Sequence, residues 1–179
     1  MNTPFNHAME FLHLTGKNQK VNKTKIVHVQ WKPPSNRYKL NTDGSFYGNP
    51  GKGGIGGVIR DKDGNWIFEY MGNIYDTTAT KAEIMALLKG LDIGLSTGAL
   101  LHQLGNPLIQ HSFREENQVA DALAKEGSRM QQANCFVQWT VPPLFVLTKV
   151  EADKVGTIFV RLKRTLIDPG NCNNDETYP

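Results

Sequence analysis

The sequence has 179 residues, 39% of them hydrophobic, with a formal net charge of +3 and a pI of about 8.8. This length suits one domain of ordinary size with tails. No run approaches the roughly 18 apolar residues that span a bilayer, and the N-terminus lacks a signal-peptide core, so we expect no membrane association. Two cysteines without metal-ligand spacing, Cys135 and Cys172, favour a reducing compartment, cytoplasmic or nuclear.

Tails are predicted at both ends of the chain. Residues 1–30 are rich in Asn, Lys and His without periodicity, which is typical of a flexible tail; weak attraction to phosphates is the alternative. The rigid lead-in Trp31-Lys-Pro-Pro-Ser35 opens a predicted domain over residues 31–156. Residues 157–179 are predicted to form a C-terminal tail.

Three strands are predicted in succession. Tyr38 to Phe46, Gly54 to Asp61 and Asn65 to Met71 are separated by turn-forming residues, which indicates an antiparallel meander. Alternation in the first strand places Asp43 on the side away from Leu40. In the third, it places Trp66, Phe68 and Tyr70 on one face. Taken alone, the Asp43-Gly44 pair favours an ordinary turn.

The period changes to helical from Thr80 onwards. Ile84, Leu88, Leu91 and Leu95 form one apolar stripe. Thr80 followed by Glu83 fits a capping box, which is a structural alternative to any chemical role for Glu83.

A further strand is predicted over Pro107 to Phe113, and a second helix over Glu116 to Met130. Asp43, Glu83 and Asp121 thus stand near the starts or ends of separate elements, away from any Cys/His cluster. Such an oxygen-donor set suits a hard cation such as Mg²⁺.

Four ordered motifs between Trp31 and Gly156 resemble the type-1 ribonuclease H domain, in the version found in plant retroelement proteins of the reverse-transcriptase-like kind. The motifs are Lys39-Leu-Asn-Thr-Asp-Gly-Ser45, Gly53-Gly-Ile-Gly-Gly-Val-Ile-Arg-Asp61, Ala82-Glu83 with Ala86-Leu87, and His111-x-x-Arg-Glu-x-Asn-x-x-Ala-Asp121. The resemblance implies an α/β fold with a mixed sheet flanked by helices. It also implies nucleic-acid binding and magnesium-dependent hydrolysis of the RNA strand of RNA–DNA hybrids, with Mn²⁺ as an alternative metal.

The resemblance also implies roles for individual residues. Asp43, Glu83 and Asp121 match three of the family's four metal-binding carboxylates, and His111 matches a histidine near the scissile phosphate. Gly44, Ser45 and Asn117 match nucleic-acid-binding positions. A strand-end histidine is the structural alternative for His111, and a simple helix N-cap is the alternative for Asn117.

One part of the family pattern is missing. The family's fourth strand carries an Asp-Ser, but here the first helix is followed by His111 after a short segment. Judged against a usual domain of about 150 residues, on the order of forty residues are absent near Gly98. Asp76, Asp92, Glu115 and Glu116 are poorly placed to substitute for the lost carboxylate. Either a genuine isoform or a mis-joined coding segment explains the gap.

The loss affects both the fold and the chemistry. We expect a sheet of three antiparallel strands plus one parallel strand, with Pro107 to Phe113 moving beside the first strand. We expect a monomer that binds nucleic acid and whose hydrolytic activity is weak or absent, because a metal ligand is lost. The alternatives are a non-catalytic nucleic-acid-binding remnant and a truncated product without a stable fold.

Overall fold

The computed structural model describes residues 21–35, 38–48, 51–96, 110–132 and 134–167. The chain divides into two compact units, residues 1–28 with 160–179, and residues 29–159. In the first unit, β1 (Val21–Val29) and β6 (Phe159–Ile167) form a two-stranded sheet. Tails were predicted in both places. The β-branched residues of Val21–Val29 favour the extended chain, a signal that the abundance of Lys and Asn obscures.

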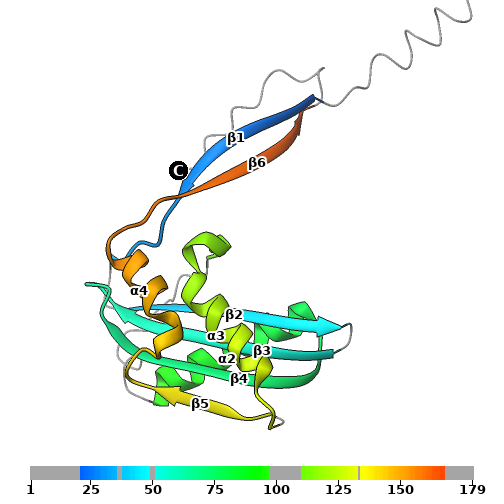
Figure 1. The fold of residues 1–179 in the computed structure, drawn as a ribbon, viewed down its shortest axis with the longest axis vertical. Coiled ribbons are helices and arrows are strands. Elements are labelled where there is room, and N and C mark those ends of the chain that lie inside the picture. Colours follow the sequence, from blue (N-terminus) through cyan, green and yellow to red (C-terminus); the bar gives the residue numbers. More distant parts are fainter. Residues whose placement is uncertain (1–20, 36–37, 49–50, 97–109, 133, 168–179) are drawn as a thin grey trace, which may run out of the picture. The chain divides into compact units, whose positions relative to one another are not determined.

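The second unit is built on a four-stranded sheet with the order β2-β3-β4-β5. The strands are β2 (Tyr38–Gly48), β3 (Gly51–Asp61), β4 (Trp66–Thr77) and β5 (Phe136–Trp139). Each pairs antiparallel with its neighbour, so the predicted meander is confirmed (Figure 1).

The fourth strand differs from the predicted one. We expected Pro107 to Phe113 to lie parallel beside the first strand, but residues 110–113 are not a strand, and 107–109 lie outside the described residues. Instead β5 pairs antiparallel with β4 at the opposite edge. Within the described residues β2 is therefore an edge strand. The α/β class is confirmed without the parallel strand.

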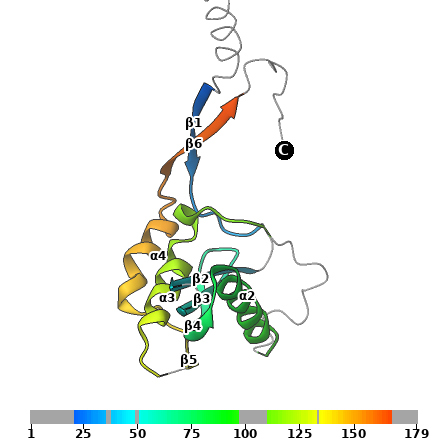
Figure 2. The ribbon, with the colours of Figure 1, turned by 90° about the vertical axis from the view of Figure 1, so that its right-hand side faces the viewer.

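Helices cover both faces of this sheet. The helix α2 (Ala79–Ser96) lies on one face, and α3 (Gln118–Arg129) and α4 (Leu147–Lys154) lie on the other (Figure 2). Two short 3₁₀ turns, η1 (Arg114–Glu116) and η2 (Leu144–Val146), precede α3 and α4. No helix in the described ranges has the length and apolar character needed to cross a membrane.

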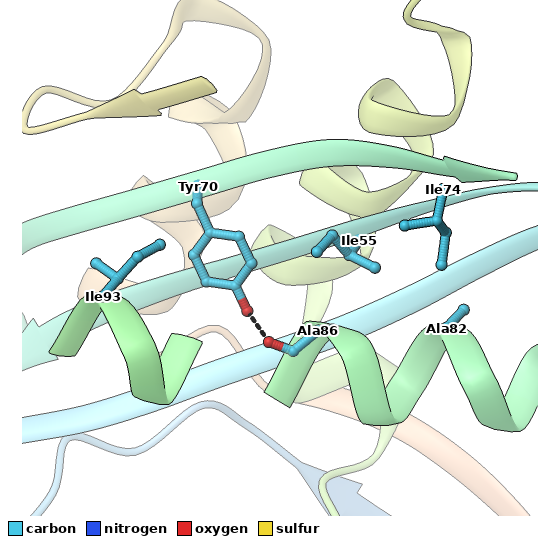
Figure 3. Packing of buried hydrophobic residues seen from close by; sticks show 6 residues of the cluster. All are labelled: Ile55, Tyr70, Ile74, Ala82, Ala86 and Ile93. Atoms are coloured by element: carbon cyan, nitrogen blue, oxygen red, sulfur yellow. Dashed lines mark hydrogen bonds between the residues drawn. The ribbon is translucent and has the colours of Figure 1, made fainter. Parts of the chain in front are cut away.

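Two hydrophobic clusters hold the helices to the sheet. On the α2 face, Tyr70 packs with Ile55 and Ile93, and its hydroxyl donates a hydrogen bond to the Ala86 carbonyl (Figure 3). The other face buries Val58, Met71, Val119, Leu123, Val146 and Val150. Trp66 packs with this second cluster rather than beside Tyr70, because the β3–β4 register shifts near Ile59 and reverses the alternation.

The sheet-facing side of α2 is not the predicted apolar stripe. Small residues, Ala82, Ala86 and Gly90, are buried against the sheet together with Ile93. Ile84, Leu88 and Leu95 of the stripe are 41–55% exposed. Helical spacing therefore identified α2 correctly. The face of α2 that is buried against the sheet is instead set by how closely the helix backbone approaches β2.

Glu69 is a buried acid on the α3 face of β4. Its residue is 0% exposed, and neither carboxylate oxygen has a hydrogen-bond partner among the described residues. Burial raises the pKa of Glu69 to about 8. Because the folded state holds this proton more tightly than the unfolded state, stability is highest below the unfolded pKa and is lost as pH rises towards 8.

Replacing Glu69 with Gln should remove this pH dependence. We expect Glu69→Gln to melt close to wild type at pH 5 and at least about 3 °C higher at pH 9, as measured by circular dichroism. The matched control is Glu151→Gln, at an exposed carboxylate on α4, which should change little at either pH. A difference between Glu69→Gln and wild type that is the same at both pH values would contradict the expectation.

Candidate active site

Asp43 lies on β2 on the face that α3 covers. It pairs with Gly56 of β3, and a Cβ added at Gly56 would collide with Leu123 and Ala124 of α3. The absence of a side chain at Gly56 lets the helix backbone lie directly against the strand. Because Asp43 is opposite this contact, it is brought close to α3, on which Asp121 lies.

Glu83 reaches β2 from the other face. A Cβ at Gly44 would lie 2.5 Å from the Glu83 nitrogen, so only glycine permits this approach of α2. The Gly44 N–H donates a hydrogen bond to the Glu83 carboxylate. The predicted capping box is absent because α2 begins at Ala79, so Thr80 lies inside the helix; the Lys81 N–H donates to the Thr78 hydroxyl at 3.3 Å. The Glu83 side chain is thus tied to β2 next to Asp43.

Asp121 lies in the first turn of α3 and is 9% exposed. Its carboxylate faces two cations. Lys125 Nζ lies 2.6 Å from Oδ2, one helical turn further along α3, and Arg114 Nε lies 3.6 Å from Oδ1. Asp121 is therefore neutralised by the protein's own side chains.

The three acids act on one another electrically, and we call Asp43, Glu83 and Asp121 the acidic cluster. Burial, followed by the charges of Glu83 and Asp121, raises the pKa of Asp43 to about 7, although Arg114 and Lys125 oppose the rise. Glu83 is exposed as a residue, yet partial desolvation of its carboxylate raises its pKa. The hydrogen bond from Gly44 and the charges of His111 and Arg114 act against that rise. The cluster thus concentrates negative charge at the β2 edge.

His111 and Asn117 join the cluster in different ways. His111 is exposed and lies in an irregular segment rather than at a strand end. It is close enough to Glu83 for its charge to lower the pKa of the Glu83 carboxyl. Asn117 occupies the N-cap position of α3, but its side chain does not cap the helix. Its Nδ2 donates to the Thr42 carbonyl at 2.8 Å and so joins the start of α3 to the strand beside Asp43.

Gly44 and Ser45, the other two predicted nucleic-acid-binding positions, both have internal contacts. Gly44 provides the space that α2 needs, as described above. Ser45 Oγ donates a hydrogen bond to the Ala124 carbonyl of α3 at 2.8 Å. Both residues therefore position the helices that carry Glu83 and Asp121, and contact with nucleic acid stays a prediction for them.

The acidic cluster suits a divalent cation in its chemistry but not in its arrangement. Its donors are carboxylate oxygens, as hard cations prefer, and burial together with the charges of Glu83 and Asp121 raises the pKa of Asp43. However, no three His, Cys, Asp or Glu side chains of the described residues are grouped so as to hold a metal ion. Asp121 faces Lys125 and Arg114 instead. Asp92, a conceivable substitute ligand, pairs with Lys89 on α2.

Sequence reasoning missed the two cations that face Asp121. Lys125 follows Asp121 by four residues, a spacing that brings side chains together on a helix and that would have indicated the ion pair. Arg114 belongs to the His111–Asp121 motif, but no helical spacing predicts its contact with Asp121, because Arg114 lies in η1 and not in α3.

Residues 41–100, which include Asp43 and Glu83, match the family described as reverse transcriptase-like. The ribonuclease H of Trichodesmium erythraeum is 31% identical over 97 residues, 54% of each chain. That of Jannaschia sp. is 43% identical over 54 residues, 28% of this chain and 34% of the relative. That of Prochlorococcus marinus is 49% identical over 47 residues, 26% and 29% respectively.

The chain spans about half or less of the length of these relatives. Within that span, the matched segment coincides with the antiparallel meander and α2, the elements that carry two of the three acids. Over this segment the chain is therefore similar to the reverse transcriptase-like family and to these ribonucleases H.

Proposed function

We propose that this domain binds RNA–DNA hybrids and that its own metal-dependent hydrolysis of them is weak or absent. The family likeness supports the substrate class, because relatives that match the chain are named ribonuclease H. Magnesium or manganese is the metal we expect the carboxylates to take. A monomeric state and a cytoplasmic or nuclear location stay predictions.

The observation that carries this proposal is the state of the acidic cluster. Three acids lie at one edge of the sheet, but Asp121 is engaged by Lys125 and Arg114. The family's fourth carboxylate has no counterpart in the sequence. Loss of a residue that only hydrogen-bonds to a metal ligand typically lowers metal affinity or activity roughly 10- to 100-fold. Loss of a ligand itself should lower both by more.

The same cations support binding to a nucleic-acid backbone. Arg114 is 77% exposed and Lys125 is 44% exposed at the side chain, so both are accessible to a phosphate. Ion pairing with phosphates releases counterions and gives affinity without base specificity. These two cations therefore support the binding part of the proposal.

A cleavage assay tests the first part of the proposal. The full chain is incubated with an end-labelled RNA–DNA hybrid and Mg²⁺, then Mn²⁺, beside Asp43→Asn as a negative control. We expect wild-type cleavage to stay within about twofold of Asp43→Asn, because the wild type already lacks one metal ligand. Robust turnover that Asp43→Asn abolishes would overturn the proposed impairment.

Salt dependence tests the second part. Hybrid binding is measured by fluorescence anisotropy in EDTA at several salt concentrations. We expect affinity to fall steeply with salt, and Arg114→Gln to lower the log–log slope by about one, since one phosphate contact is lost. The matched control is Lys62→Gln at the β3–β4 turn, where Lys62 pairs with Asp63. Equal slopes for Arg114→Gln and wild type would count against a phosphate contact at the cluster.

A further inference from the structure

The ion pair between Lys125 and Asp121 links an accessible cation to a mostly buried acid. The Asp121 side chain is 13% exposed and the Lys125 side chain 44%. Both lie on α3 one turn apart, so the helix itself holds them in register. A separation of 2.6 Å between Nζ and Oδ2 is a short, charge-assisted contact.

The charge of Lys125 acts beyond its direct partner. It lowers the pKa of Asp43, which burial and the neighbouring acids raise. Arg114 acts in the same direction, but it is more exposed and stands 3.6 Å from Asp121. Arg114 acts more strongly than Lys125 on Asp43, but Lys125 is the better placed of the two cations to pair with Asp121.

We propose that Lys125 competes with divalent cations for Asp121, and that this competition keeps the acidic cluster from holding a metal ion tightly. The inference deepens the proposed function, on which it rests for the biological role of the site. The Asp121 carboxylate can pair with the Lys125 ammonium or bind a metal ion. An incoming ion must therefore displace the ammonium. The contact is consistent with the absence of a metal-binding group of three His, Cys, Asp or Glu side chains among the described residues.

The test is direct binding of Mn²⁺ alone to the full chain, measured by isothermal titration calorimetry and by the paramagnetic resonance signal of free Mn²⁺. Lys125→Met keeps the aliphatic stem and removes the charge. We expect it to bind Mn²⁺ roughly three- to tenfold tighter than wild type, the range for losing a partly exposed, hydrogen-bonded ion pair. Unchanged, weaker or unmeasurable binding by Lys125→Met would overturn the proposal.

Three further variants separate this competition from a general effect of charge or folding. Arg129→Met removes one positive charge from α3 at a residue that pairs with Glu126, and should bind Mn²⁺ as wild type does. Lys125→Arg keeps the charge and should also behave as wild type. Adding Asp121→Asn to Lys125→Met should abolish the gain. A gain in Arg129→Met, or one that survives Asp121→Asn, would contradict the assignment, and thermal melts check that each variant folds.

The same variants keep this inference distinct from the proposed function. Hybrid binding in EDTA should weaken in Lys125→Met, because the phosphate contact that we propose for Lys125 is lost. The Mn²⁺ affinity of the same variant should rise. If wild type fails to bind the hybrid but Lys125→Met still gains Mn²⁺ affinity, the nucleic-acid function is wrong and the competition stands. If hybrid binding is present without any gain in Mn²⁺ affinity, the competition is wrong and the function stands.

Discussion

The close packing of helix backbone against β2 and β3 is the constraint on which the acidic cluster depends. At Gly44 the first turns of α2 lie against β2, and at Gly56 the middle of α3 lies against β3. A methyl group at either position would push a helix away from the sheet. Glu83 or Asp121 would then move away from Asp43, since each is carried by the helix concerned.

Hydrogen bonds reinforce these two contacts. The Gly44 N–H donates to the Glu83 carboxylate, and the Asn117 side chain donates to the Thr42 carbonyl. Ser45 donates to the Ala124 carbonyl of α3. Residues 42–45 thus bind both helices while presenting Asp43 between them. Residues 42–45, which belong to a motif that resembles one of the ribonuclease H domain, therefore also have a structural role.

Holding the acids together is electrostatically unfavourable, and the protein offsets the cost with cations. Burial raises the pKa of Asp43, and the like charges of Glu83 and Asp121 add to the rise. Lys125 and Arg114 counter that field from α3 and η1. Their presence accounts for a cluster that has the acids of a metal site without the grouping of such a site.

Local patterns located most elements of the second unit but not the surfaces by which they pack. The turn residues between alternating segments predicted the meander, and helical spacing predicted α2 and α3. The apolar stripe of α2 misled, because Ala82, Ala86 and Gly90 allow a closer approach to the sheet than leucines would. Trp66 changed face because of a register shift, which depends on the partner strand. Residues 110–113 were expected in a strand, but strand formation needs a neighbour to pair with.

The sequence by itself determined the antiparallel meander and the two main helices, because short-range periodicity encodes them, and the resemblance of its motifs singled out the three acids. Only the tertiary structure decided that β5 is the fourth strand, that α2 already begins at Ala79, and that Lys125 and Arg114 face Asp121. Strand pairing, helix approach and ion pairing depend on groups from separate segments meeting in space. No local pattern specifies those distances.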